Sequence, residues 1–489
     1  MRIDFRVARR KMRRVMRASL IALTPVLLLR FALITAATLL TSCTLPPPGA
    51  QPPLPDNLQP GPSWTVSFTG RTTAEPAAWL EQFDDASLRA AVREAVAANP
   101  DLHAAAARMR QARIRAVRDG AARLPEINAG IRASQSGGRA SGWDFASDYT
   151  LSLDVSWEAD VWGRVRDNVS ASIADAQAAE ADYAAARFSL AANAAKAYCN
   201  LLEAEAQVDL ARRTVETFRR QISSVEKAFD KGIKEVPASD VRLARTSVAS
   251  AESNLQARLR ARDSAQRSLE ALLGRYPSGA VKTSGRLPGL RRTVPAGLPS
   301  TLLLRRPDIL AAERRIAAAM KRKDVARKAL LPSFRLSAGT GSGGPGLSDL
   351  LDGRKLAATL LQSLTQPLYK GGALRATVRL SEAEREELVS RYAATASEAF
   401  REVETAMAAE HYLAEQIKAQ RVFVEESEES DRMATARYEK GILGNDGVVV
   451  LRLLETQRRI FDSRSGLLRL ENQLLQARID LCLALGGGF

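Results

Sequence analysis

The sequence predicts a mostly α-helical chain with four β-strands, built as two structural repeats, whose strands contribute to a small membrane β-barrel. Only 5% of the 489 residues are aromatic, and alanine-rich segments dominate, which suits long packed helices. Apolar residues recur every seven positions from Leu201 and again from Leu453, as in coiled coils. The segment Asp148–Gly163 instead alternates apolar and polar side chains, which is typical of a strand.

The N-terminal residues have the parts of an export signal. The basic cluster Arg6–Arg17 precedes two apolar runs that Arg30 separates. A retained membrane anchor is the alternative, but Arg30 leaves no clean run of about 18 apolar residues. The segment Leu40–Cys43 resembles the lipobox of bacterial lipoproteins. We therefore expect residues 1–42 to be a lipoprotein signal peptide and Cys43 to carry lipid.

Composition and internal repetition divide the rest of the chain. A proline-rich segment at 43–78 suits a tether between the lipid and a folded body. Two repeats are expected at 79–285 and 305–489, joined by a linker at 286–304. The landmarks that define them are Leu124 and Leu331 (331 − 124 = 207), Gly163 and Gly372 (372 − 163 = 209), Phe229 and Tyr438 (438 − 229 = 209), and Leu273 and Leu485 (485 − 273 = 212).

Each repeat is expected to run helix, strand, strand, long helix, turn, long helix. In the first repeat, the strand "INAGIRAS" follows Leu124-Pro125, and Gly137-Gly138 turns the chain into the next strand. In the second, a strand at Phe334–Ala338 precedes the expected loop "GTGSGGPG" at 339–346. A weaker strand is expected near Leu356–Leu368, because glutamines dilute its apolar face.

The strand within Asp148–Gly163 has one apolar face, and a lipid bilayer can cover such a face in an exported, lipidated chain. A soluble sheet packed on helices is the alternative. Four strands cannot close a barrel, and open edges do not occur in the hydrocarbon core, so several copies must pool their strands. Two copies would supply eight strands and three would supply twelve. The apolar face carries Tyr149, Leu151, Leu153, Val155 and Trp157.

Several segments resemble one protein family. They are "WLEQFDDASL", "NPDLHAAAARMRQAR", "WEADVWGRVR", "LPSTLLLRRPDILAAERRIAAA", "LTQPLYKGGALRA" and "LALGGGF". Through them, residues 79–489 resemble the TolC-like outer-membrane efflux factors. Within that family, they resemble the lipoprotein channel subunits of resistance-nodulation-division (RND) tripartite efflux systems.

The resemblance implies a homotrimer with a twelve-stranded barrel in the outer membrane, continued by an α-helical tunnel into the periplasm. It implies a periplasmic adaptor protein, an inner-membrane RND transporter and outer-membrane lipid as partners. The expected function is passive conduction of small molecules such as drugs through this exit duct. Two alternatives are the outer-membrane channel of a type I-like protein-secretion system and a lipid-anchored coiled-coil envelope protein without a pore.

No constellation of residues predicts an enzyme, a metal site, a cofactor or nucleic-acid binding. His103 and His411 lie in separate helical segments without the spacing of a metal pair. The run Glu425–Glu429 is expected to be a solvated face. Arg305-Arg306 offers a candidate anion site, but Pro307-Asp308 more simply opens a helix. The formal charge of +16 is spread along the helices without a basic stripe.

Two further sets of residues are expected to form the end of the tunnel. The turns between long helices, where glycine and proline interrupt the pattern, should form the periplasmic tip, with Gly232, Pro237, Gly441 and Gly447. The stretch "LRLLETQR" resembles the family's periplasmic gate and places Leu451, Glu455 and Arg458 on one helical face. The alternative is that these side chains form ordinary pairs between helices, away from the channel axis.

Three points stay open at the level of sequence. The true start codon has Met12 and Met16 as alternatives to Met1. The exported substrate cannot be read from the residues. Cys199 and Cys482 are expected to be buried free thiols, but their pairing is not decided by the sequence.

Overall fold

The computed structural model describes residues 79–139, 143–230, 237–290, 305–439 and 448–486. The first repeat contains η2 (Trp79–Gln82), α2 (Ala86–Ala98), α3 (Pro100–Gly120), η3 (Ala121–Arg123), β1 (Glu126–Arg139), β2 (Trp143–Ala159), α4 (Arg164–Asp230) and α5 (Ala238–Leu272). The second contains α7 (Pro307–Lys328), β3 (Ser333–Gly344), η4 (Leu347–Leu351), η5 (Gly353–Lys355), β4 (Ala357–Thr365), α8 (Ala373–Glu439) and α9 (Val448–Ala484). None of the helices in these ranges combines the length and apolarity needed to cross a bilayer.

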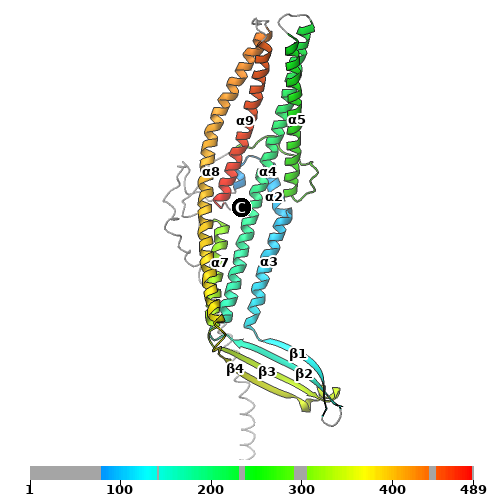
Figure 1. Ribbon diagram of the computed structural model, residues 1–489, viewed down its shortest axis with the longest axis vertical. Helices are drawn as coiled ribbons and strands as arrows, with labels where there is room; N and C mark the ends of the chain where they lie inside the picture. Colours follow the sequence, from blue (N-terminus) through cyan, green and yellow to red (C-terminus); the bar gives the residue numbers. More distant parts are fainter. Residues whose placement is uncertain (1–78, 140–142, 231–236, 291–304, 440–447, 487–489) are drawn as a thin grey trace, which may run out of the picture. The chain divides into compact units, whose positions relative to one another are not determined.

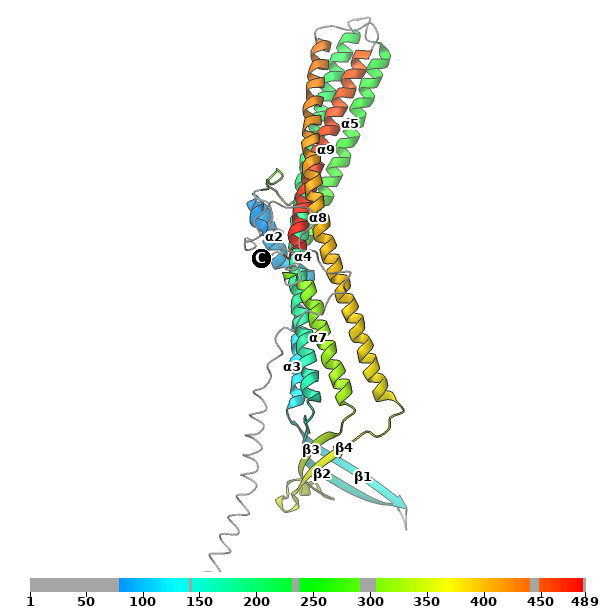
Figure 2. The ribbon, with the colours of Figure 1, turned by 90° about the vertical axis from the view of Figure 1, so that its left-hand side faces the viewer.

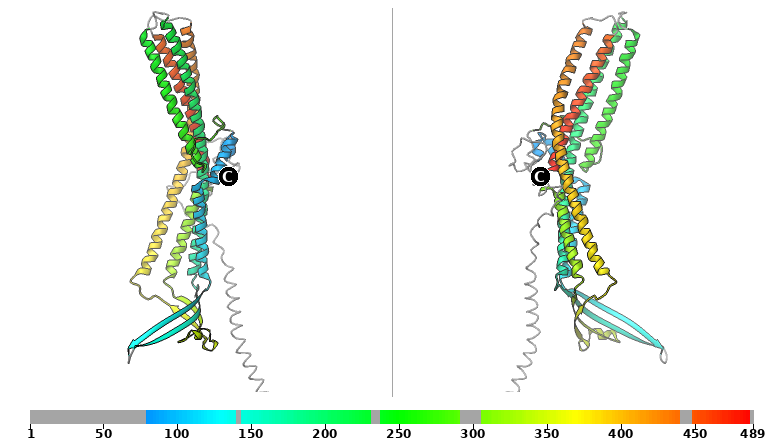
Figure 3. Two further views of the ribbon diagram at one scale, coloured as in Figure 1. Left: turned by 90° about the vertical axis from the view of Figure 1, so that its right-hand side faces the viewer. Right: turned by 60° about the vertical axis from the view of Figure 1, so that its left-hand side comes forward.

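The long helices form a wall that is one layer thick (Figure 1), and α2 lies to one side of it, packed on α4. Next to the strands the packed neighbours run α3, α4, α7 and α8, and farther from the strands they run α5, α4, α9 and α8. Figures 2 and 3 show the hairpins α4–α5 and α8–α9 side by side, leading away from the strands. The wall therefore has two free edges, one formed by α3 and α5 and the other by α8.

Each repeat is closed by an equivalent hydrogen bond, from a side chain near its start to a backbone carbonyl near its end. This equivalence confirms the predicted duplication. Asn99, just before α3, donates its side-chain N–H to the carbonyl of Leu272 at 3.0 Å. Arg306, just before α7, donates to the carbonyl of Ala484 at 3.1 Å. The donors differ by 306 − 99 = 207 positions and the acceptors by 484 − 272 = 212, as the sequence landmarks do. The end of α5 is thus fastened to the start of α3, and the end of α9 to the start of α7.

A glycine makes this closure possible in each repeat. Gly274 has φ +71°, and a Cβ there would lie 2.5 Å from the carbonyl oxygen of Ala98. Gly486 has φ +68°, and a Cβ there would lie 3.1 Å from the carbonyl oxygen of Arg305. Left-handed backbone at the end of a helix favours glycine, and here the lack of a side chain also lets two helices meet.

The four strands form one antiparallel sheet in the order β1, β2, β3, β4. Two sequence predictions are wrong here. Gly137-Gly138 does not turn the chain but lies in β1, paired with β2. Residues 339–344 of the expected glycine-rich loop belong to β3 and pair with β2. The reason is close approach, because a Cβ at Gly341 would lie 2.4 Å from the carbonyl oxygen of Leu151.

The weak strand is confirmed but is shorter than expected. β4 ends at Thr365, two residues before Pro367, which has no N–H to donate to a ladder. Gln362 lies within the strand, opposite Leu336, whereas Gln366 lies beyond its end.

The main core lies where α2, α4, α8 and α9 meet. Large side chains there, such as Phe83, Tyr198 and Met407, are at most 1% exposed. Around them α4 contributes many buried alanines, which let the helices approach closely. The predicted heptad in α4 is confirmed over Leu201, Val208 and Val215, all buried.

The closure of the first repeat gives a prediction about stability. Gly274→Ala forces a Cβ against the Ala98 carbonyl and an alanine into left-handed backbone. We expect it to lower the free energy of unfolding by about 1 to 3 kcal/mol, measured by thermal unfolding of the purified protein. Gly289→Ala is the control, because a Cβ there meets no atom within 4 Å. Equal melting temperatures for both variants would contradict the proposed role of the glycine.

Candidate functional site

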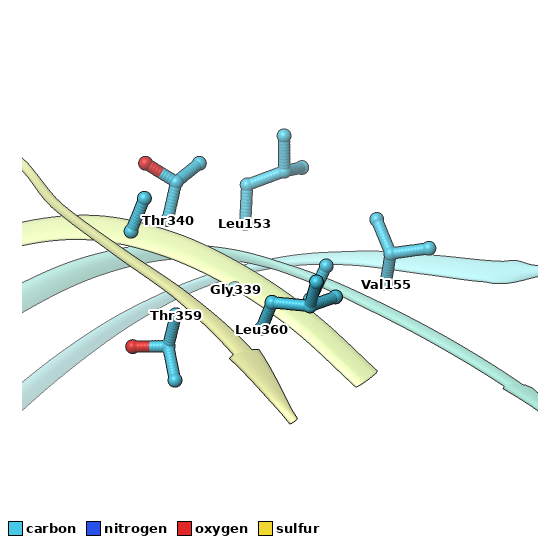
Figure 4. Close-up of a pocket in the computed structure, with 8 residues that line it drawn as sticks. Leu153, Val155, Gly339, Thr340, Thr359 and Leu360 are labelled. Atoms are coloured by element: carbon cyan, nitrogen blue, oxygen red, sulfur yellow. The ribbon is translucent and has the colours of Figure 1, made fainter. Parts of the chain in front are cut away.

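The sheet has one apolar face and one polar face. Strand register places Ile131 beside Leu151, Leu153 beside Thr340, and Ala338 beside Leu360, all on the same face. Figure 4 shows Leu153, Val155 and Thr340 projecting from one side of the sheet and Thr359 from the other. On the apolar face Ile131 is 74% exposed and Leu360 is 69% exposed. A single chain therefore leaves this face uncovered.

The opposite face carries hydroxyl groups and charges. Thr150, Ser152, Asp154 and Ser156 of β2 lie on it, as the alternation predicts. Ser152 donates to Asp154 at 2.9 Å, and Thr150 donates to Asp148 at 3.1 Å. Such a face is compatible with water, whereas the apolar face is compatible with lipid.

Two strand edges lack a partner within the described part of the chain. β1 pairs with β2 and β4 pairs with β3, so one edge of each outer strand is unpaired. Unpaired backbone N–H and C=O groups are incompatible with the hydrocarbon core of a membrane. The sheet is therefore incomplete as a membrane structure until another strand covers each edge.

The junction between sheet and helices is built from equivalent hydrogen bonds in the two repeats. Trp157 donates its indole N–H to the carbonyl of Arg123 at 3.0 Å, and Gln366 donates to the carbonyl of Leu330 at 2.9 Å. Gln366 follows Trp157 by 366 − 157 = 209 positions, and Leu330 follows Arg123 by 330 − 123 = 207. Sequence reasoning missed this role of Gln366, although the repeat offset marks it as the counterpart of Trp157.

A second set of bonds fixes the start of α4. Asp160 accepts hydrogen bonds from the backbone N–H groups of Val165 and Arg166 at 2.9 and 2.7 Å. Trp162 donates its indole N–H to the carbonyl of Pro332 at 2.8 Å, which links the two repeats. These bonds hold β2 and α4 in a fixed relation at the point where the predicted barrel passes into the helical wall.

Asp167 is the charged centre of this junction. Its buried carboxylate accepts hydrogen bonds from Lys321, at 3.2 Å, and from Lys328, both on α7. Burial raises the pKa of Asp167, but the hydrogen bonds from the two lysines outweigh burial, and the pKa lies below its usual value. The ion pairs therefore tie the first repeat to the second just above the strands.

The three residues resembling the gate lie on α9. Leu451 is 42% exposed, and Glu455 and Arg458 are also exposed, so their common face does not pack on another described helix. Arg458 is 3.9 Å from Asp462 on the same helix. Glu455 forms no ion pair with any residue in the described ranges. Within one chain, the three side chains thus do not form pairs between helices.

Asp431 fastens this part of α9 to α8. It accepts hydrogen bonds from Thr456 at 3.0 Å and from Gln457 at 2.6 Å, the two residues that lie between Glu455 and Arg458. Burial raises the pKa of Asp431, although these two hydrogen bonds lower it. Sequence reasoning did not single out Asp431, because its contact partners are remote in sequence.

Most of the predicted tip and the lipid site lie outside the described residues. These are Cys43, Gly232, Gly441 and Gly447. Pro237 is described as the exposed residue that precedes α5.

The other candidate sites have structural explanations. Arg306 is only 11% exposed and pairs with Asp308 and Glu402, so it has no free face for an external anion. His103 and His411 are exposed on separate helices. In the described ranges, no three His, Cys, Asp or Glu side chains gather as metal ligands would.

The two described cysteines are free and buried. Burial raises the pKa of Cys199 and of Cys482 to about 12, so neither thiol ionises near neutral pH. The open question of their pairing is answered, since no disulfide joins them.

Comparisons with known proteins agree on one kind of molecule. Residues 91–275 and 298–487 match the family described as "Outer membrane efflux protein". The pyoverdine export outer membrane protein OpmQ of Pseudomonas putida is 31% identical over 92% of this chain and 95% of its own. The cation efflux system protein CusC of Escherichia coli is 29% identical over 95% of this chain and 100% of its own. A solved membrane protein from Pseudomonas aeruginosa is 30% identical and covers 91% of this chain and 98% of its own, with a TM-score of 0.81.

The Asp167 junction gives a pH-dependent prediction. Its pKa is lower in the folded than in the unfolded chain, so its stabilisation is present above the unfolded pKa and is lost as pH falls through the folded pKa. At neutral pH we expect Asp167→Asn to cost about 1 to 2 kcal/mol, because two partly buried lysines lose their partner. The difference from the parent protein should shrink as the pH is lowered below about 4.

Thermal unfolding across this pH range measures the effect. Asp209→Asn on the same helix is the control, since the ion pair between Asp209 and Arg212 is exposed. A deficit for Asp167→Asn that persists unchanged in acid would contradict the assignment.

Proposed function

Since the chain belongs to the outer membrane efflux protein family and is an outer-membrane efflux channel, we infer that it serves as the exit duct of a tripartite pump. Three copies are proposed to form one channel. It conducts small molecules passively, with energy supplied by an inner-membrane RND transporter through a periplasmic adaptor. We propose no catalytic residue and no cofactor for it.

The observation that supports this proposal best is the open, two-faced sheet. Its apolar face is uncovered, its polar face suits water, and its outer strands have free edges. A closed barrel of several copies satisfies all three properties at once, because it removes every edge, turns the apolar face to lipid and encloses the polar face. Three chains supply twelve strands, which exceeds the eight of the smallest single-chain barrels.

The helical wall supports the same arrangement. Its free edges lie on the same sides as the strand edges, with α3 and β1 on one side and α8 and β4 on the other. Contact between unlike edges is head-to-tail and generates a ring when the rotation closes. The ring of helices continues the barrel as a tunnel. We keep 79–285 and 305–489 as the proposed repeats and 286–304 as their linker.

The cargo is not assigned by family membership. One relative is named for pyoverdine export and another for cation efflux, at similar identity to this chain. A channel that does not itself recognise its cargo is compatible with the names of both relatives. We therefore propose small molecules as the class, selected by the transporter.

The exposed face of α9 is the proposed gate. Leu451, Glu455 and Arg458 lie on a surface that the rest of the described chain leaves free, near the end of the hairpin away from the strands. In a ring of three copies these faces are proposed to converge on the axis. Leu451 then supplies an apolar constriction, and Glu455 of one copy pairs with Arg458 of the next.

The gate is tested by current through planar bilayers. The purified protein should insert as a channel with a low resting conductance, and Glu455→Ala with Arg458→Ala should raise it several-fold without the adaptor. Arg469→Ala on the same helix is the control, because Arg469 is exposed but lies farther from the hairpin end.

Two results would count against the proposals in different ways. Unchanged conductance of the double variant would exclude the gate assignment alone. Absence of any channel from correctly assembled protein would exclude the exit duct itself and favour a coiled-coil envelope protein.

Lipid attachment at Cys43 is proposed as the anchor. The mature protein should begin at this residue and carry the mass of a diacylglycerol and an amide-linked acyl chain, which mass spectrometry of its N-terminal peptide measures. Cys43→Ser should remove both the processing and the added mass. An unmodified Cys43 in protein isolated from membranes would contradict the anchor.

A further inference from the structure

The connection between β3 and β4, residues 345–356, lies at the end of the sheet away from the helices (Figure 1). It contains η4 and η5 and leaves three leucines exposed, Leu347 at 67%, Leu351 at 87% and Leu356 at 63%. We propose that this connection anchors the protein in the outer leaflet of the membrane, where its leucines enter lipid and Arg354 binds the phosphate of a lipid headgroup. The inference rests on the proposed function, because it requires the sheet to span the membrane as part of a barrel.

The connection folds back over the apolar face of the sheet. Ser342 lies on that face, two positions along β3 from Thr340, and its buried side chain donates a hydrogen bond to the carbonyl of Leu350. Gly344 lies on the same face, and a Cβ there would collide with the carboxylate of Asp349. The connection is therefore on the side of the sheet that faces lipid in the proposed barrel.

Hydrogen bonds and an ion pair fix the shape of the connection. Asp349 accepts a hydrogen bond from the backbone N–H of Gly346 at 3.2 Å and pairs with Lys355 at 2.7 Å. Asp352 accepts a hydrogen bond from the backbone N–H of Arg354 at 3.0 Å. The leucines are thus exposed on a segment that is held in one conformation. Such an apolar surface marks a site of contact with another apolar material.

The strand register places the connection at the outer interface of the membrane. β2 pairs with β3 over residues 149–159, a stretch of 11 residues (159 − 149 + 1 = 11), and a membrane strand takes about 9 to 11. Tyr149 lies at the outer end of this stretch and Trp157 near its inner end, as in the two aromatic girdles of membrane barrels. Tyr149 pairs with Gly344, the last residue of β3 before the connection. The connection therefore lies at the depth where acyl chains meet headgroups.

Lipid, and not a neighbouring copy, is the material that this position exposes to the leucines. η4 packs on β2 and β3, the two inner strands of the sheet, whereas the free edges available to other copies belong to β1 and β4. The surface of the connection continues the apolar face that carries Leu153 and Leu360 (Figure 4). Whatever covers that face in the membrane also covers the leucines of the connection.

The charges of the connection are complementary to anionic headgroups. Its two acids, Asp349 and Asp352, accept hydrogen bonds within the connection, whereas Arg354 and Lys355 are exposed. Lys355 is already paired with Asp349, but Arg354 forms no ion pair with a residue in the described ranges. An arginine near a membrane surface can extend its guanidinium to the headgroups, and its planar N–H groups match a phosphate. We therefore assign the phosphate contact to Arg354.

Spin labels test the contact with lipid. The full-length protein is reconstituted into vesicles of phosphatidylcholine and phosphatidylglycerol with a nitroxide on Leu351→Cys. Dissolved oxygen should reach this label more readily than a water-soluble nickel complex does, by a ratio several-fold higher than at Tyr276→Cys. Tyr276 is the matched control, because it is 85% exposed but lies just after α5, in the helical part. Leu360→Cys, on the apolar face of β4, marks the lipid side, and Cys199 and Cys482 are buried and stay unlabelled.

The three labels separate this inference from the function on which it rests. A Leu351→Cys label in water, with the Leu360→Cys label in lipid, would overturn the anchor but keep the barrel. An immobilised Leu351→Cys label with dipolar broadening between copies would place a protein surface there and would also overturn the anchor. A Leu360→Cys label as accessible to the nickel complex as Tyr276→Cys would overturn the membrane-spanning sheet and this inference with it.

Binding of a defined lipid tests the headgroup contact. Native mass spectrometry of the assembly in mild detergent counts bound phosphatidylglycerol, and Arg354→Gln should lower the count several-fold. Arg132→Gln is the matched control, because Arg132 is also exposed but lies on the polar face of β1, opposite Thr150. Its count should equal that of the parent protein. Unchanged binding by Arg354→Gln, or an equal loss in both variants, would overturn the assignment of the phosphate to Arg354.

Discussion

The requirement that a membrane-embedded sheet have no free edge governs this molecule. β1 and β4 each leave one edge of backbone N–H and C=O groups without a partner in the described chain, and hydrocarbon offers none. Only further strands satisfy these groups, so the chain needs other copies of itself. The free edges of the helical wall, at α3 and α8, lie on the same sides of the chain as these strand edges. Closing the sheet therefore also closes the wall.

Internal duplication lets one chain supply two similar units to this closed structure. Within each repeat, a glycine lets the end of the last helix contact the start of the repeat closely. The two repeats are joined to each other by the hydrogen bond of Trp162 and by the ion pairs of Asp167.

Much of the fold was predictable because it depends on local pattern. Heptads, alternating strands and repeat landmarks are all periodic, and the structure confirms them. Glycines in β1 and β3 were misassigned as a turn and a loop. At Gly341 and Gly343 of β3 the reason for glycine is the nearby backbone of β2, which no local pattern reveals. The candidate gate residues were predicted to share one helical face. Asp431, which fastens this part of α9 to α8, was not predicted, since it lies 25 positions from its partner Thr456.

The number of chains in the conducting particle tests the central claim most directly. Native mass spectrometry of the protein in mild detergent, on the same preparation that conducts in bilayers, counts them. The open edges and the twelve-strand closure predict three copies and no stable smaller species. A particle that conducts as a single chain would contradict the claim that the barrel is shared.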